Sequence, residues 1–225
     1  MTTVLVDLLP LIIGAALLPV WIIITLLLLR SEGGLWKALA FVGGSTLVKL
    51  AQGLLFGMVF DTAYKSNDYY TDTNPIAATL QLIVGILMMI TAIKKWNKED
   101  DPDAPPPRWM TMFSGVSVVQ TLGIGVLLTI VAIKQWVFTL SALSIITQAL
   151  LTQTEGALTF VIYVLASQSL LLAPIIISAI APTRSASLLD TAQTWLERHN
   201  RVLMIAASSI FGIWFLWKGI TGLIN

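Results

Sequence analysis

Long apolar segments recur along the whole of this 225-residue chain, and only short polar stretches separate them. A helix that crosses a bilayer needs about 20 consecutive, mostly apolar residues. Charged residues make up 11% of the chain, whereas soluble domains contain about 25%. The sequence therefore predicts an all-α, polytopic membrane protein with one transmembrane domain, 1–225. A net charge of +1 gives no reason to expect a nucleic-acid partner.

Six segments are the expected spans, and one of them is unusually long. They are Leu5–Leu29, Trp36–Phe60, Pro75–Ile93, Phe113–Leu151, Ala157–Ile180 and Val202–Ile224. The fourth, Phe113–Leu151, is roughly twice as long as a bilayer needs. It is either one broken, tilted or extended crossing, or two crossings that meet at Lys134–Gln135.

The basic residues favour six crossings over seven. With six, loops on one side carry nine Lys and Arg, and the other side carries Lys65 and Lys218. The nine are Arg30, Lys37, Lys94, Lys95, Lys98, Arg108, Arg184, Arg198 and Arg201. With seven crossings, the Arg184–Arg201 group would move outside and the bias would weaken. Because basic loops stay in the cytoplasm, we expect both termini on the non-cytoplasmic side, in a bacterial inner membrane by default.

A proline-rich stretch of mixed charge divides the chain into two halves of three spans each. This stretch, 94–112, has the composition of a solvated cytoplasmic linker. It separates a first unit, 5–96, from a second, 113–224. Within the second unit, 185–201 has apolar residues at helical spacing, which predicts an amphipathic helix on the cytoplasmic face. A simple helical connector is an equal alternative for that segment.

Short sequence matches indicate that the two halves are repeats. Ala38–Val42, with the sequence ALAFV, resembles Ala157–Val161, with ALTFV. Continuing this register sets Lys49 opposite Gln168. Because each half has an odd number of spans, the second copy would enter the membrane upside down. Two inverted three-helix repeats are a common plan for transporters.

The first and fourth spans are expected to be kinked or broken. Pro19 removes a backbone donor and displaces the helical turn before it. A second short match sets Pro19 against Ile133, inside the lysine-bearing stretch Ala132–Gln135. Interrupted helices at corresponding positions point to a transporter binding site. The alternative for Pro19 is a kink that only shapes helix packing.

Two lysines are the strongest candidates for binding a substrate. Lys49 lies near the middle of Trp36–Phe60, where a lysine costs roughly 3 kcal/mol to insert. Either end of that span is roughly 15 Å away, beyond the reach of its side chain. Lys134 is a second buried cation if the fourth span is one crossing, and a snorkelling loop residue if it is two. No Asp or Glu lies deep in a predicted span, so the lysines would receive an anion or release a proton.

Several polar residues in the spans are further candidates for substrate binding. They are Gln52, one turn from Lys49, together with Gln120, Thr121 and Gln168. Each is either a substrate ligand or a hydrogen-bonding contact between helices. No metal-ligand cluster or phosphate loop is recognisable, so we expect no metal and no cofactor. An intramembrane enzyme is poorly supported, although Ser45 lies one turn before Lys49 and a Ser–Lys pair is geometrically possible.

Three segments carry a resemblance to a known superfamily. They are Leu9–Pro19, Trp36–Gly44 and Val131–Lys134. With these, the chain resembles the LysE superfamily of small six-helix exporters, and within it the GAP group of glycopeptidolipid- or sulfolipid-addressing proteins. Relatives commonly have Asn-Pro-Lys where this chain has Ala-Ile-Lys134; the missing proline weakens the expectation of a strong break there. The resemblance implies export of amino acids, metal ions or cell-envelope lipids.

Together these features predict a secondary transporter and not an enzyme. We expect a proton-coupled exporter of a small anionic or zwitterionic solute or an acidic lipid. The alternative is a membrane-embedded assembly factor or subunit of envelope-lipid machinery that transports nothing itself. The expected partners are the lipid bilayer and the substrate, and a homodimer is possible for so small a chain.

Overall fold

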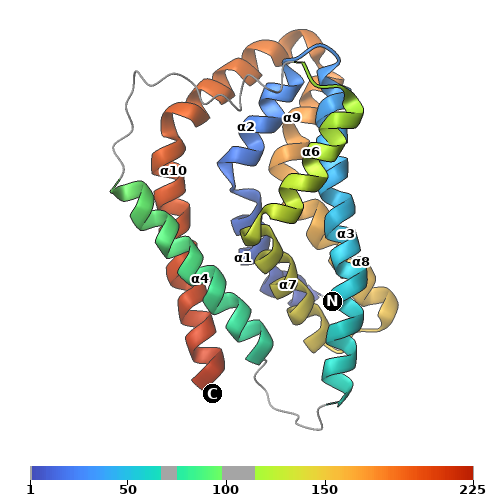
Figure 1. The fold of residues 1–225 in the computed structure, drawn as a ribbon, viewed down its shortest axis with the longest axis vertical. Coiled ribbons are helices and arrows are strands. Elements are labelled where there is room, and N and C mark those ends of the chain that lie inside the picture. The colour runs from blue at the N-terminus through green and yellow to red at the C-terminus, as the bar shows by residue number, and fades with distance from the viewer. Residues whose placement is uncertain (1, 67–74, 98–114, 225) are drawn as a thin grey trace.

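The structure, a computed structural model, describes residues 2–66, 75–97 and 115–224 (Figure 1). Within these residues the chain forms helices and no strands, which confirms the all-α prediction. The helices are α1 (Thr2–Ala16), α2 (Pro19–Leu29), α3 (Gly34–Ser66), α4 (Pro75–Trp96), α6 (Val118–Val131), α7 (Ile133–Gln148), α8 (Gln153–Ser167), α9 (Ser169–Ile180) and α10 (Pro182–Ile224).

Three helices are each long and apolar enough to cross a membrane, and three bent helix pairs bring the total to as many as six spans. The unbent spans lie in α3, α4 and α10, at Gly34–Val59, Ala78–Trp96 and Arg198–Ile224. The prediction of a polytopic membrane protein is therefore confirmed. The long fourth segment forms α6 and α7, which meet at Ala132 with a bend of 73°. Since α6 occupies the upper half of the bundle and α7 the lower half, the arrangement favours one broken crossing over two crossings (Figure 1).

The two halves of the chain run in opposite directions through the bundle (Figure 1). The pair α1–α2 rises from the end where the chain termini lie, whereas α6–α7 descends towards it. Likewise α3 descends and α8–α9 rises, and α4 and α10 pack against each other in opposite senses. Pro19 is the first residue of α2 and Ile133 is the first residue of α7. The two residues that the repeat alignment pairs thus occupy equivalent places, directly after the break of their span.

A third break was not expected from the sequence. We predicted Ala157–Ile180 as one continuous helix, but the chain forms α8 and α9, which meet at Gln168 with a bend of 66°. The helices of the first broken pair, α1 and α2, meet at 59° beside Pro19. The stretch around Gln168, from residue 157 to residue 173, contains neither proline nor glycine. The fifth-span prediction is therefore wrong in its continuity, and tertiary contacts account for the break, as described below.

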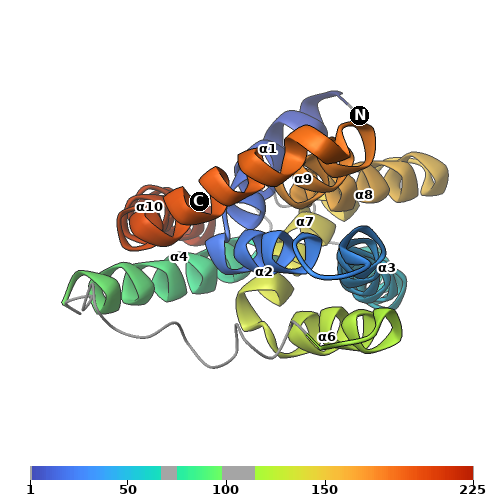
Figure 2. The same cartoon turned by 90° about the horizontal axis from the view of Figure 1, so that it is seen from above.

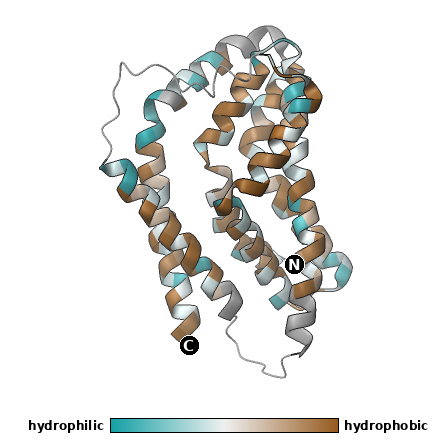
Figure 3. Ribbon diagram, viewed as in Figure 1, coloured by the Kyte–Doolittle hydropathy of each residue, from teal (hydrophilic) through white to brown (hydrophobic). Residues whose placement is uncertain are grey.

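Of the two segments predicted to be cytoplasmic, 185–201 and the described start of the linker lie towards the upper end of the bundle (Figure 1). The helical part of the linker ends with α4, and residues 98–112 lie outside the described residues. The segment 185–201 belongs to α10, which crosses the upper end of the bundle before it descends (Figures 1 and 2). This part of α10 and the end of α4 are the more hydrophilic parts of the ribbon, while the helix halves below them are mostly hydrophobic (Figure 3).

Two arginines, Arg30 and Arg201, hold the crossing segment of α10 to the ends of other helices. Arg30, the C-terminal cap of α2, forms a salt bridge of 2.8 Å with Asp190 and donates to Gln193 at 2.8 Å. Arg201 donates to the backbone carbonyls of Lys95 and Trp96, in the last turn of α4. Arginine at a helix C-terminus satisfies carbonyls that have no partner within the helix.

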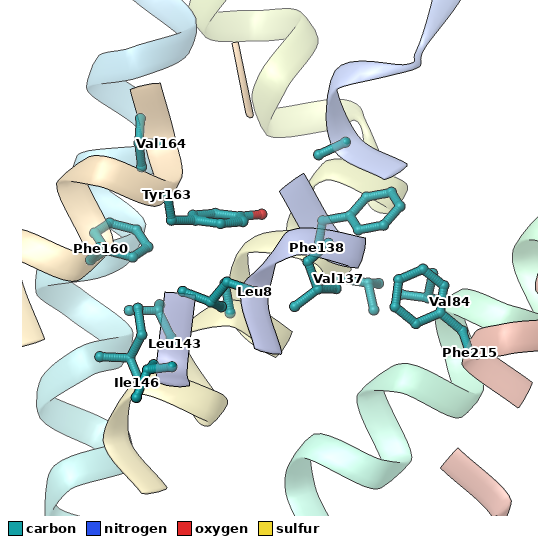
Figure 4. Packing of buried hydrophobic residues seen from close by; sticks show 14 of the residues in the cluster. Leu8, Val84, Val137, Phe138, Leu143, Ile146, Phe160, Tyr163, Val164 and Phe215 are labelled. Atoms are coloured by element: carbon teal, nitrogen blue, oxygen red, sulfur yellow. The ribbon is translucent and has the colours of Figure 1, made fainter. Parts of the chain in front are cut away.

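Buried apolar side chains form two clusters, one above the other. The upper cluster, from α2, α3 and α9, consists of Trp21, Ile24, Leu28, Ala38, Phe41, Val42, Leu171 and Ile175. The lower cluster comes mainly from α1, α7 and α8, with Val84 and Met88 of α4 and Phe215 of α10 (Figure 4). It includes Leu8, Val84, Val137, Phe138, Leu143, Phe160, Tyr163, Val164 and Phe215. Because α2 and α9 supply the upper cluster while α1 and α8 supply the lower one, the helix breaks lie between the two clusters.

Candidate functional site

Three breaks among the described helices leave helix ends partway along the bundle; Pro19 and Gln168 at two of them are buried, whereas Ile133 at the third is exposed. The helices that begin at them, α2, α7 and α9, have no side-chain hydrogen bond at their N-terminal caps. The first N–H groups of a helix have no partner within the helix and carry its positive partial charge. Half-helices that begin near the membrane midplane bind anionic substrate groups in several transporters. The broken spans therefore supply donors where polar side chains also gather.

Lys49 is the centre of this group. It lies midway along α3 and its side chain is only 2% exposed. Its Nζ donates to Ser167 Oγ at 3.2 Å, and Ser167 Oγ in turn donates to the carbonyl of Val164 at 2.9 Å. An ammonium group has three donors, and within the described residues Lys49 has no acidic partner. A buried cation without a counter-charge is costly in a membrane, which makes it a candidate binding group.

Gln168 joins the break between α8 and α9 to α3. Its Nε2 donates to Thr46 Oγ1 at 2.9 Å, one turn of α3 above Lys49. The residue is 1% exposed, and its Oε1 has no hydrogen-bond partner among the described residues. Lys49 and Gln168, which the repeat register aligns, therefore lie close together. Lys49 bonds to Ser167, the residue before Gln168, and Gln168 bonds to Thr46, one turn from Lys49. We call Thr46, Lys49, Ser167 and Gln168 the polar cluster.

Two further glutamines are buried with unsatisfied side chains. Gln52, one turn below Lys49 on α3, is 3% exposed, and neither its Oε1 nor its Nε2 has a partner in the described part of the chain. Gln135, in the first turn of α7, is buried and its Oε1 is likewise unpaired. An unpaired buried amide costs about 1–3 kcal/mol, so each of these groups needs an explanation. Binding of a polar ligand would provide one.

Lys134 does not join the polar cluster. It is half-buried in the first turn of α7, where it donates to Thr91 Oγ1 of α4. Thr91 Oγ1 donates onward to the carbonyl of Leu87 at 2.7 Å. A cation near a helix N-terminus lies at the positive end of the helix dipole, which is unfavourable unless an anion is nearby. The two lysines thus lie inside the bundle and contact different helices.

The remaining predicted residues have structural contacts. Pro19 is buried at the start of α2, where it contributes no side-chain hydrogen bond. Gln120 is exposed and forms a capping box with Ser117 at the N-terminus of α6. Thr121 is buried and its hydroxyl donates to the carbonyl of Ser117 at 2.8 Å. Along α6, roughly 18 Å separates Gln120 from the break at Ala132, so the structure does not bring Gln120 and Thr121 to the polar cluster.

A comparison with protein families identifies relatives of the chain. The family model described as Sap, sulfolipid-1-addressing protein, matches residues 8–221. The chain belongs to the Sap family. This confirms the resemblance to the sulfolipid-addressing proteins of the GAP group, while membership of the LysE superfamily stays a prediction. No curated protein and no solved structure matches the chain.

Sequence reasoning missed four polar residues of this Sap-family chain: Thr46, Thr91, Gln135 and Ser167. Ser167 directly precedes Gln168, and Gln135 directly follows Lys134, so their position beside candidate residues could have identified them. Thr91 had no such signal, because only the packing of α4 against α7 brings it to Lys134. Among the described residues, Lys49 shows no hydrogen bond to Ser45, the residue that a Ser–Lys pair would require. The described residues also contain no group of three or more His, Cys, Asp or Glu that could hold a metal.

Proposed function

We propose that the protein is a secondary transporter whose polar cluster binds the anionic group of an acidic lipid or small solute. The observation that carries this proposal is Lys49, a buried cation whose contact in the described residues is the neutral hydroxyl of Ser167. A carboxylate, phosphate or sulfate ester would supply the missing negative charge and accept further hydrogen bonds. The unpaired oxygens of Gln168 and Gln52 could accept hydrogen bonds from hydroxyl groups of the same ligand.

The arrangement of the helices supports transport over static binding. Two halves of opposite direction, each starting with a span broken near its middle, are typical of transporters that expose one central site to either side in turn. Bends at three breaks give such a molecule places where helix halves can tilt against each other. On this proposal the chain is a member of the LysE superfamily, lies in a bacterial inner membrane with both termini outside the cytoplasm, and exports its substrate.

Proton coupling is part of the same proposal. The empty carrier can return without an uncompensated buried cation only if Lys49 also loses its charge when the anion leaves. Release of a proton from Lys49 would meet that requirement. Proton and anion would then cross in the same direction, so flux would depend on the pH difference across the membrane, and this dependence would disappear when Lys49 is replaced by an uncharged residue.

The test is counterflow in liposomes that contain the purified protein. The panel of labelled compounds comprises acidic lipids, carboxylates, amino acids and divalent cations. We expect flux of an anionic compound by the wild type and loss of that flux in Lys49→Met. Lys218→Met is the matched control, because Lys218 is exposed on α10 and contacts the Trp214 ring. Equal flux in wild type and Lys49→Met would contradict the proposed site.

A second candidate function rests on the family description. A protein that addresses a sulfolipid, as the family is described, could be a non-transporting subunit of envelope-lipid machinery. Its lysines would then hold a lipid headgroup or a partner protein in place. Gentle purification with crosslinking separates the candidates: a stable complex with other envelope proteins, together with an absence of flux by the isolated chain, would favour the subunit.

A further inference from the structure

An open apolar groove runs down one outer face of the bundle to the polar cluster. It lies between α3, α6 and α9 and has a volume of about 630 Å³, within the 300–1,000 Å³ that is usual for ligand sites. Trp36 lines its upper end and Thr46 its lower end. Leu122 of α6 and Leu172 of α9 contribute to its sides. Apart from Thr46, the side chains that line it are apolar or interfacial aromatic.

The dimensions of the groove match one leaflet of a membrane. The part of α3 from Trp36 to Thr46 is roughly 15 Å long, which is half of the roughly 30 Å hydrocarbon core. Trp36 is 66% exposed and lies near the upper end of the bundle, as expected for a tryptophan at the membrane interface. The groove therefore extends from the interface to about the middle of the membrane.

Thr46 belongs to both the groove and the polar cluster. Its hydroxyl accepts the hydrogen bond from Gln168 Nε2 and donates to the carbonyl of Val42 at 2.7 Å. Lys49 follows one turn further along α3, where its side chain is buried and bonded to Ser167. The polar end of the groove thus continues directly into the group of residues that carries the proposed function. An apolar groove open to lipid that ends at Thr46, one helical turn from a buried cation, has the chemistry of a site for an amphiphile.

We propose that the groove between α3, α6 and α9 holds one acyl chain of an anionic lipid whose headgroup contacts the polar cluster. The inference rests on the proposed function and narrows its substrate class to amphiphiles that enter sideways from the bilayer. In this pose the chain runs from the polar cluster back towards Trp36, so the headgroup lies deeper in the membrane than the end of the chain. The tail has no need to cross the protein, because the groove is open to the membrane along its length. Only the headgroup is desolvated, and it meets Lys49, Gln168 and the uncapped N-terminus of α9.

Glycines on α3 provide a matched pair of variants. Gly43 lines the groove, and a Cβ added there would meet nothing within 4 Å. Gly57, on the same helix and outside the groove, is equally open. Gly43→Leu would therefore fill the groove without displacing a neighbouring helix, while Gly57→Leu makes the same change in helix propensity and side-chain size elsewhere. Any difference between the two variants reports on the groove.

The experiment is photolabelling in phosphatidylcholine nanodiscs, with a phosphatidylglycerol that carries a diazirine in one acyl chain. Peptide mapping would compare groove residues with Leu55 and Met58, which are exposed on the lower half of α3 and serve as a measure of general lipid contact. We expect saturable, several-fold enrichment of label in the groove. Lys49→Met should lower this enrichment about tenfold or more, as removal of a charge-assisted contact would. Gly43→Leu should lower it by a similar factor, because the added side chain fills the groove. Gly57→Leu should leave it unchanged.

Three results would overturn the inference. Even labelling over α3 would mean that the groove sees only bulk lipid. Enrichment that survives Lys49→Met would mean that the groove holds chains without a headgroup at the polar cluster. Disulfide-linked dimers of Gly43→Cys without lipid label in the groove would mean that a second copy of the chain covers it; the natural sequence contains no cysteine, so this thiol would be unique. Lysine-dependent flux of a water-soluble anion with no groove labelling would leave the proposed function standing and remove only the acyl-chain site.

Discussion

Lys49 Nζ donates to Ser167 Oγ across 3.2 Å, and this hydrogen bond ties the middle of α3 to the last residue of α8. The next residue, Gln168, is the break of the fifth span and bonds to Thr46 of the same α3 helix. Two adjacent residues at one break therefore hold two residues one turn apart on α3. The break and the buried cation form a single unit, so a change at either should affect the other.

Replacement of Lys49 should separate stability from function. Lys49→Met keeps an unbranched side chain of similar length and removes a buried cation that has no counter-charge. Because a buried charge costs several kcal/mol to desolvate, we expect the variant to be as stable as the wild type or more stable, while anion flux is lost. Thermal unfolding in detergent and counterflow in liposomes measure the two effects. A variant that loses flux and unfolds at a clearly lower temperature would indicate that Lys49 is structural.

The hydrogen bond itself can be measured by a double-mutant cycle. Ser167→Ala should lower the free energy of unfolding by about 1–3 kcal/mol while Lys49 is present, because the buried ammonium loses its acceptor. In the Lys49→Met background the same substitution should cost clearly less. Equal costs in the two backgrounds would show that the contact between Lys49 and Ser167 contributes no coupling energy.

Helix packing beside this unit gives a further prediction. A Cβ at Gly53 would lie 2.2 Å from the ring of Phe160, whereas one at Gly57 would meet nothing within 4 Å. Gly53→Val should therefore cost about 1–3 kcal/mol of stability through overpacking between α3 and α8. Gly57→Val, with the same change of propensity, is the control. If both variants unfold alike, or if Phe160→Ala fails to relieve Gly53→Val, the close approach of these helices is not what the structure describes.

The sequence predicted the parts of this fold that depend on local chemistry. Apolar length predicted the membrane spans, and Pro19 marked the first break because it lacks a backbone N–H. The depth of Lys49 followed from its distance to both ends of its span. A second short repeat match paired Pro19 with Ile133, and both turn out to begin the second helix of a broken span.

The parts that depend on tertiary contacts were beyond local reasoning. The break at Gln168 has no proline, and it is held by hydrogen bonds to α3 that only the packed bundle provides. The contact of Lys134 with Thr91 joins residues far apart in the chain. Gln120 is a different case: Ser117 three residues before it is a capping-box signature, which a local reading could have used to assign it a structural role.

Comparison of two glutamines tests that distinction between capping and binding. Gln120→Ala removes one side of the capping box at the exposed start of α6, so we expect a small loss of stability, at most about 1 kcal/mol, and unchanged flux. Gln168→Ala removes the bond to Thr46 and a buried acceptor beside Lys49, so flux should fall markedly. Counterflow at equal protein density in the liposomes measures both variants, and Ser117→Ala provides an independent loss of the same cap. If Gln120→Ala reduces flux as strongly as Gln168→Ala while Ser117→Ala does not, the Gln120 amide binds substrate after all, and the site extends along α6 to the upper end of the bundle.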